Sequence, residues 1–198
     1  THASGGTLEA LLQQTLFQPL GMNHAYIRQV PTATTAAKGH VPGGREVAAW
    51  DFPDAMAGVG GVRASLDDMT RYAAALLGRG DAGVVANLER ATTPLLTPVD
   101  GPAMALGWPV LAVGATTIIA HDGGTGGFSS FIAVDKTHQR AVVVLADTSM
   151  ASFGFINELA LHLLDPALAD APTPRLATTP AARPTRRRHN ANHGLRWR

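Results

Sequence analysis

The chain has 198 residues, no cysteine and a formal net charge of +1. The lack of cysteine excludes disulfide bonds, thiolate catalysis and cysteine-ligated metals. The nearly balanced charge gives no general argument for an acidic partner. The hydrophobic fraction of 45% is typical of a globular protein, and no segment approaches the ~18 consecutive apolar residues of a membrane span.

The N-terminal part of the sequence predicts one helix followed by a long irregular segment. A helix that begins at Thr7 and ends near Pro19 and Gly21 would align its apolar side chains on one face. That face consists of Leu8, Leu11, Leu12 and Leu16. Proline and glycine punctuate residues 23–57, which are predicted to be irregular. A loop of this length is typical of a binding edge or of partial disorder.

A second helix is predicted after Ser65, a residue type that caps helix N-termini well. Asp67 and Asp68 are interpreted as acidic residues of its first turn. Helical spacing of apolar residues continues to Leu76, and Gly78 is suited to the C-terminal cap.

From Leu106 onwards the pattern changes to runs of β-branched and aromatic residues, which predict antiparallel strands. Residues 141–146 are continuously apolar, which is typical of a strand buried on both faces. Phe153–Leu164 follows helical spacing, and a helix after such a meander packs on the sheet. The predicted fold class is α+β, an antiparallel sheet with packed helices. The predicted strands are Trp108–Val113, Thr116–His121, Phe128–Val134 and Arg140–Ala146.

Residues 166–198 differ from the rest in being rich in Pro, Ala, Thr and Arg. This composition offers little apolar surface to bury and predicts a disordered basic tail. A contact with nucleic acid or another acidic surface is one alternative. We favour instead a solvated tail, or sequence from a shifted or read-through end, and expect no nucleic-acid partner.

The most informative segment is His121–Phe128, where four glycines and a threonine separate two predicted strands. Such a Gly-rich edge lets a ligand approach the backbone closely. The alternative is a Gly-rich hairpin that binds nothing. The segment resembles the third motif of the serine β-lactamase and penicillin-binding-protein superfamily, which reads Lys-Thr-Gly-Ala-Thr-Gly-Gly-Phe in class C β-lactamases.

Two further segments are similar to the same superfamily and occur in its order. Gln18–Met22 resembles its Pro-Leu-Gly-Met segment, and Gly58–Met69 resembles its segment Gly-Gly-Leu-x-Ser-Thr-x-x-Asp-(Leu/Met). The three matches span roughly residues 5–165. The resemblance implies the C-terminal half of a β-lactamase/transpeptidase-like fold and a serine hydrolase that forms an acyl-enzyme from an amide or ester.

The resemblance also implies roles for individual residues. The backbone N–H of Gly124 corresponds to an oxyanion donor, and His121 stands where the family usually has a lysine cation. Gly123 would keep the strand edge open, and the Thr125 hydroxyl would contact a substrate carboxylate. Asp122 replaces a family threonine in this substrate-binding set, and its charge would repel a carboxylate. These departures argue against β-lactam hydrolysis and leave peptidase and esterase chemistry open.

Two family motifs are missing from the sequence. The nucleophile motif Ser-x-x-Lys does not occur, because neither Lys38 nor Lys136 follows a serine by three residues, and neither Tyr26 nor Tyr72 begins a Tyr-x-Asn motif. We therefore expect residues 1–165 to form a partial β-lactamase-like domain that lacks the nucleophile region and is inactive alone. The alternative is a non-catalytic protein that binds a ligand or partner with the same half-fold.

The sequence predicts no metal site and no cofactor, because its histidines lack the close spacing of a zinc site. Trp50 and Trp108 are interpreted as core or cleft-wall residues. The expected partner of the completed site is a small-molecule amide or ester. The first residues show no signal-peptide pattern.

Overall fold

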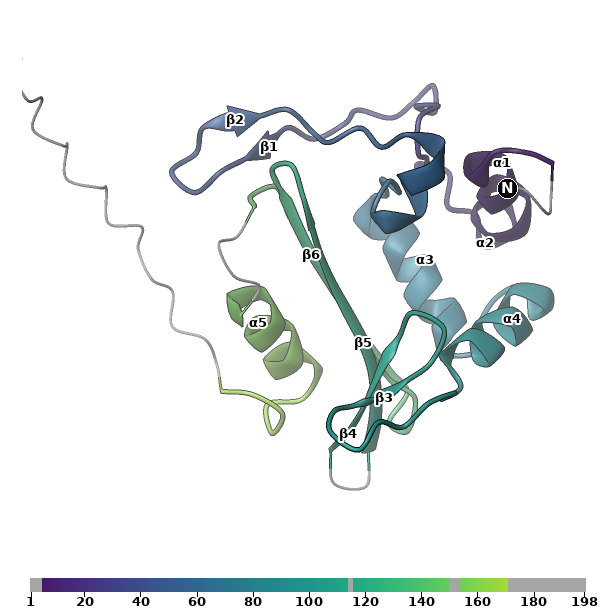
Figure 1. Cartoon of the computed structure of the whole chain (residues 1–198), viewed down its shortest axis with the longest axis vertical. Helices are drawn as coiled ribbons and strands as arrows, with labels where there is room; N and C mark the ends of the chain where they lie inside the picture. The colour runs from purple at the N-terminus through teal and green to yellow at the C-terminus, as the bar shows by residue number, and fades with distance from the viewer. Residues whose placement is uncertain (1–4, 114–115, 150–153, 171–198) are drawn as a thin grey trace, which may run out of the picture.

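The computed structural model of the chain describes residues 5–113, 116–149 and 154–170. Figure 1 shows a central sheet seen edge-on, with α5 on one side and α3 and α4 on the other. The predicted α+β class is confirmed. Among the described residues, no helix is long and apolar enough to cross a membrane.

The N-terminal helical segment runs through α1 (Leu8–Leu12), the π-helical η1 (Gln13–Phe17) and α2 (Gln18–Leu20). Thr7 caps it, as predicted, by accepting a hydrogen bond from the N–H of Ala10. The π-helical turn ends at Phe17, two residues before Pro19, which has no N–H to donate to a preceding carbonyl. Gly21 ends the segment in the left-handed conformation at φ 67°.

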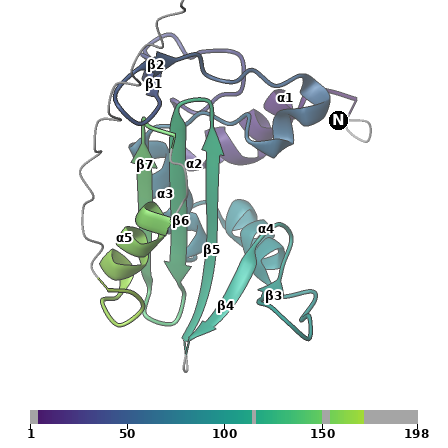
Figure 2. The ribbon, with the colours of Figure 1, turned by 60° about the vertical axis from the view of Figure 1, so that its left-hand side comes forward.

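The segment predicted to be irregular contains three short elements. β1 (Gly39–His40) and β2 (Glu46–Val47) form a small antiparallel hairpin, and η2 (Asp54–Val59) is a 3₁₀ helix. No hydrophobic periodicity marks strands of two residues, so sequence analysis missed them. Figure 2 shows the β1–β2 hairpin lying across the upper end of the large sheet.

Helix α3 (Leu66–Leu76) follows the prediction closely. Ser65 and Asp68 form a capping box, and Asp67 pairs with Arg71 one turn later at 3.0 Å. Helix α4 (Ala82–Thr92) was not predicted. Its Gly and paired valines are weak helix formers, whereas its Asp81 cap, which accepts from Gly83 and Val84, is a signal that could have found it.

The described residues form a five-stranded antiparallel sheet in the order β3-β4-β5-β6-β7. Its strand β5 is longer than predicted because the glycines after His121 stay paired with β6. β7 was predicted to be buried on both faces; α3 and α5 do cover its two faces, but it is half-buried because it lies at the edge of the described sheet. The strands are β3 (Ala103–Met104), β4 (Pro109–Val113), β5 (Thr116–Thr125), β6 (Phe128–Asp135) and β7 (Arg140–Ala146).

Two apolar cores lie on opposite faces of the sheet. Ile119, Ile132 and Val134 face the N-terminal helices, α3 and α4. Ile118, Phe131 and Ala133 face α5 (Gly154–Leu164), whose Ile156, Ala160 and Leu164 are buried against them. The period-2 alternation of strand side chains produces this division. The same alternation determines on which face of the sheet each side chain of β5 lies.

The predicted tail lies mostly outside the described residues. Of residues 166–198, the structure describes 166–170, which form a turn after α5. Leu168 packs against the α5 core, and the carbonyl of Ala169 is 3.0 Å from Nδ1 of His162.

Candidate active site

The turn between β5 and β6, Gly126-Gly127, is covered by residues 39–50. Gly127 has a φ of 80°. A Cβ on Gly127 would lie 2.5 Å from Cα of Gly39, and a Cβ on Gly126 would lie 2.5 Å from Cδ1 of Trp50. No side chain fits at those distances, so both glycines are required by this packing.

His40 ties the β1–β2 hairpin to two parts of the sheet. Its N–H donates to the carbonyls of Gly127 at 3.1 Å and Asp147 at 2.9 Å. The N–H of Ser149 donates to the His40 carbonyl at 2.8 Å, and Nδ1 of His40 lies 3.5 Å from Oδ2 of Asp147. These contacts hold the β5–β6 turn, β1 and the end of β7 together.

His121 and Asp122 point to opposite faces of β5. His121 is exposed and meets the ring of Trp108 edge to face at 6.1 Å between centroids. Asp122 is directed toward α5, where its Oδ2 accepts a 2.9 Å hydrogen bond from Nδ2 of Asn157. The structure therefore directs the two side chains apart, and the contact between the residues is that of Nδ1 of His121 with the backbone carbonyl oxygen of Asp122 at 2.5 Å.

One edge of β5 is open beside the Gly-rich run. β4 pairs with β5 only from Thr116 to Ile119, whereas β6 pairs with it from Ile118 to Thr125. Among the described residues, no strand pairs with the β4-side edge of residues 120–125. This leaves a length of backbone that can accept an extended ligand.

A cavity of about 400 Å³ lies around the β5–β6 turn, with Phe128 and Ser129 of β6 and Ser149 also in its lining. Gly124 and Thr125 line one side, and Val41, Val47 and Trp50 line the other. The Trp50 side chain is 58% exposed, which makes it a cleft-wall residue, whereas Trp108 packs partly buried against the core. Sequence analysis did not assign Val41 or Val47 to the site, because their segment carries no periodic pattern.

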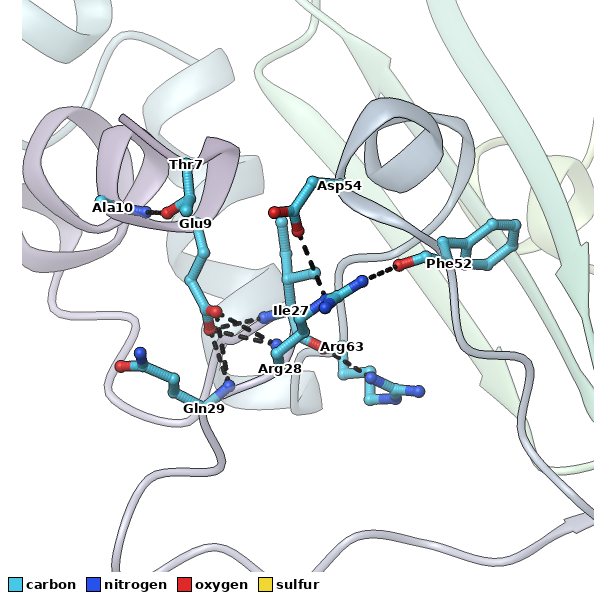
Figure 3. Close-up of polar contacts among 9 residues, drawn as sticks. All are labelled: Thr7, Glu9, Ala10, Ile27, Arg28, Gln29, Phe52, Asp54 and Arg63. Carbon is cyan, nitrogen blue, oxygen red and sulfur yellow. Dashed lines mark hydrogen bonds and ion pairs between the residues drawn. The ribbon is translucent and has the colours of Figure 1, made fainter. Parts of the chain in front are cut away.

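Arg28 and Arg63 donate to backbone carbonyls of the loop that carries Trp50, and Figure 3 shows the bond from Arg28 to Phe52. Arg63 donates to the carbonyls of Ile27 at 2.6 Å and Trp50 at 2.9 Å. Arg28 donates to the carbonyl of Phe52 at 2.7 Å, and Phe52 packs edge to face on Trp50 at 6.2 Å. The cavity wall is therefore anchored by charged groups that do not face the cavity.

Glu9 organises the backbone that these arginines use. Its carboxylate accepts from the N–H groups of Ile27 at 2.9 Å, Arg28 at 3.2 Å and Gln29 at 3.0 Å (Figure 3). Burial alone would raise the pKa of Glu9, but these three backbone donors and the Arg28 charge together lower it. Glu9 is therefore held as a carboxylate that joins the first helix to residues 27–29.

The described residues contain no group of three His, Asp or Glu side chains placed to hold a metal ion. What the site offers is an open strand edge with a glycine backbone, an exposed imidazole and an adjacent apolar cavity. This combination suits recognition of an extended, carbonyl-bearing molecule.

Comparison with known proteins identifies the family. The family model for Beta-lactamase matches residues 1–165, and the chain belongs to this family. The chain is 29% identical over 187 residues to "Unguisins hydrolase ungD'" of Aspergillus campestris (strain IBT 28561), covering 87% of this chain and 35% of that protein. It is 28% identical to "Unguisins hydrolase ungD" of Aspergillus violaceofuscus (strain CBS 115571), covering 75% of this chain and 32% of that protein.

Solved structures confirm the fold. A class C β-lactamase from Rhodobacter sphaeroides superposes with a TM-score of 0.68 at 18% identity, over 76% of this chain and 52% of that one. A β-lactamase/D-alanine carboxypeptidase from Pseudomonas syringae gives 0.62 at 24% identity, over 72% and 49%. The chain thus spans about a third of the curated relatives' length and about half of these structures.

Proposed function

We propose that this chain supplies the substrate-binding edge and the oxyanion donor of a serine hydrolase that forms an acyl-enzyme from an amide or ester. The serine nucleophile would come from polypeptide outside these 198 residues. The observation that carries the proposal is the open edge of β5 at residues 120–125, which holds His121, Gly124 and Thr125. Gly124 and Thr125 of this edge also line a cavity.

The register of β5 supports Gly124 as the oxyanion donor. Thr125 and Phe128 close the two-residue turn, so the backbone groups of Thr125 face β6. Backbone N–H and C=O groups of an antiparallel strand alternate between its two edges. The N–H of Gly124 is therefore directed to the open edge, where it can bind developing negative charge on a carbonyl oxygen.

The side-chain directions support different roles for the neighbouring residues. His121 is exposed on the face away from α5. Its Nδ1 contacts the Asp122 carbonyl oxygen, so Nε2 is the ring nitrogen that we assign to a polar contact with the acyl group. Thr125 lines the cavity and offers its hydroxyl to substrate. Asp122 already has a partner in Asn157, so the proposal gives Asp122 a role in joining β5 to α5 and leaves it out of substrate binding.

The edge of β7 supports addition of a second polypeptide. Its sequence has the continuously apolar pattern of a central strand, and α3 and α5 cover its two faces. A cavity of about 540 Å³ beside the edge is lined in part by Leu66, Val143 and Leu163. Leu66 is 57% and Leu163 62% exposed. Exposed apolar edges invite strand pairing, and we propose that the nucleophile-bearing polypeptide pairs here.

A non-catalytic binding function is the second candidate. It is favoured by the absence of Ser-x-x-Lys and Tyr-x-Asn from the sequence. On this account the β5 edge and its cavity bind a ligand, and no covalent chemistry follows.

Hydrolysis by a completed protein separates the two candidates. The chain is joined to the polypeptide encoded immediately upstream and assayed with p-nitrophenyl esters and amides. We expect turnover that Gly124→Pro lowers by ~100- to 1000-fold in kcat, because proline removes the N–H donor. Gly124→Ala, which keeps the N–H, is the matched control, and thermal unfolding checks that both variants fold. Equal rates for both variants would remove Gly124 from the oxyanion site, and no turnover by the completed protein would favour the binding function.

A further inference from the structure

We propose that the cavity beside Gly124 and Thr125 binds a neutral apolar group of the substrate, preferably an aromatic ring, and rejects a carboxylate. The inference rests on the proposed function in taking this cavity as the substrate-side pocket. It goes further by naming the chemical class of the group that occupies the pocket.

The wall that the β1–β2 hairpin and Trp50 contribute to the cavity is apolar, whereas Thr125, Ser129 and Ser149 add hydroxyl groups to the rest of the lining. Val41, Val47 and Ala48 come from the β1–β2 hairpin and its exit, and the Trp50 ring stands beside them. Removing apolar surface from water stabilises a complex by about 25 cal/mol per Å², and Trp50 can also stack on an aromatic ring. The volume of about 400 Å³ is sufficient for a ring and its linker.

The cavity has no cation to neutralise a carboxylate. Among the described residues, no Lys, Arg or His side chain lines it. The His121 side chain is not part of the lining, although Gly124 and Thr125 follow it closely in β5. The described lining offers a carboxylate neutral hydroxyls, such as those of Thr125 and Ser149, but no cation. Burying a charge without an opposite charge costs several kcal/mol, so the cavity favours a neutral group over the carboxylate contact that the family resemblance implies for Thr125.

The charged groups packed around the cavity strengthen this selectivity. His40, which precedes the lining residue Val41, pairs with Asp147 at 3.5 Å between Nδ1 and Oδ2, and the Asp147 carboxylate would repel a second anion. On the other side, Arg63 is engaged by the carbonyls of Ile27 and Trp50 and lies over the Tyr26 ring at 5.7 Å. These contacts hold the Arg63 guanidinium outside the cavity lining, where it does not offer its charge to a bound carboxylate.

Close packing fixes the position of the cavity wall formed by Ala48 and Trp50. Gly126 approaches Trp50 so closely that a Cβ there would lie 2.5 Å from Cδ1 and 2.6 Å from the carbonyl oxygen of Ala48. The anchoring by Arg63 fixes the other side of the same loop. A preformed apolar wall loses little entropy on binding a rigid ring.

Ligand binding to the 198-residue chain itself tests this inference without the nucleophile. The probes are N-acetylphenylalanine amide and the same molecule with a carboxylate on the ring, N-acetyl-4-carboxyphenylalanine amide. Backbone amide signals of residues 124–127 are followed by NMR. We expect the neutral probe to bind with a Kd at least ~10-fold lower than the charged one, both in the millimolar range typical of fragments.

Variants test whether probe binding depends on the cavity wall or is non-specific. Trp50→Ala should weaken the neutral probe by ~10-fold or more, as expected for losing an aromatic contact of about 1.4 kcal/mol or more. Val99→Ala, at a fully exposed position, should change nothing. Val47→Lys places a cation in the wall and should reverse the preference toward the charged probe.

Several results would overturn the inference. It fails if the charged probe binds the native chain as well as the neutral one, or if neither probe shifts the signals at ~20 mM, far above a fragment's expected Kd. A completed protein that hydrolyses esters but prefers a carboxylate-bearing acyl group would keep the proposed function and remove this selectivity.

Discussion

His121 and Asp122 are neighbours in β5, yet each belongs to a different part of the molecule. His121 is exposed beside Trp108 at the open strand edge, and Asp122 accepts a hydrogen bond from Asn157 of α5 on the other face. The resemblance to the family placed both residues in the site. The alternation of the strand separates them, giving His121 a chemical role in our proposal and Asp122 a structural one.

The His121 assignment predicts a loss of turnover in the completed protein. His121→Ala should lower kcat/KM by ~10- to 1000-fold, typical of losing a positioned polar or proton-transfer group. His121→Lys should retain more activity and flatten any pH dependence between about 6 and 7, because lysine stays charged there. Unchanged kcat/KM for His121→Ala across this range would place His121 outside the chemistry.

The Asp122 assignment predicts an effect on stability. Asp122→Ala removes the acceptor for partly buried Asn157 and should lower the free energy of unfolding by about 1–2 kcal/mol. Chemical denaturation of the 198-residue chain measures this. Asp100→Ala, at an exposed loop position, is the matched control and should cost less than about 0.5 kcal/mol. Equal small effects would show that the Asp122–Asn157 bond contributes nothing.

The hydrogen bonds of Glu9 predict a pH-dependent contribution to the free energy of unfolding. Its pKa is lowered in the folded chain, since backbone donors and Arg28 outweigh burial. The stability it provides is therefore present above its ordinary pKa of about 4.3 and is lost as pH falls through the lower folded value. The difference in unfolding free energy between native chain and Glu9→Gln should be largest above pH ~5 and shrink on acidification. The exposed Glu158→Gln is the control, and a difference that grows at low pH would contradict the prediction.

We predict that residues 166–170 contribute to the stability of the fold and that residues 171–198 do not. A chain that ends at Asp170 should keep the melting temperature of the full chain, because composition offers residues 171–198 little to bury. A chain that ends at Asp165 loses Leu168 from the α5 core and should be destabilised by about 1–2 kcal/mol. If the chain that ends at Asp170 melted at a lower temperature than the full chain, residues 171–198 would contribute to stability and the prediction would be wrong.

Elements with strong local signals were predictable from sequence. Ser65 and its capping box located α3, and runs of β-branched residues located four strands and their order. The C-terminal end of β5 was missed because glycine was taken to stop a strand, whereas cross-strand pairing with β6 carries the ladder through Gly123 and Gly124. Local propensity loses to tertiary pairing at such positions.

The cavity wall could not be predicted in the same way. Val41 and Val47 reach the site through a two-residue hairpin whose position depends on His40 bonding to Gly127 and Asp147. These contacts join residues more than eighty positions apart in the chain, and no local pattern encodes them. The resemblance located the strand edge, and only the three-dimensional packing revealed what lies beside it.

The central claim is that this chain completes a serine hydrolase without containing its nucleophile. Intact mass spectrometry after exposure to a fluorophosphonate tests it most directly. The account predicts no stoichiometric adduct on the 198-residue chain alone, because an oxyanion donor cannot form an acyl-enzyme. It predicts one adduct per molecule in the protein completed by the upstream polypeptide, on a serine of the added part. A stoichiometric serine adduct on the chain alone, or none on the completed protein, would contradict the account.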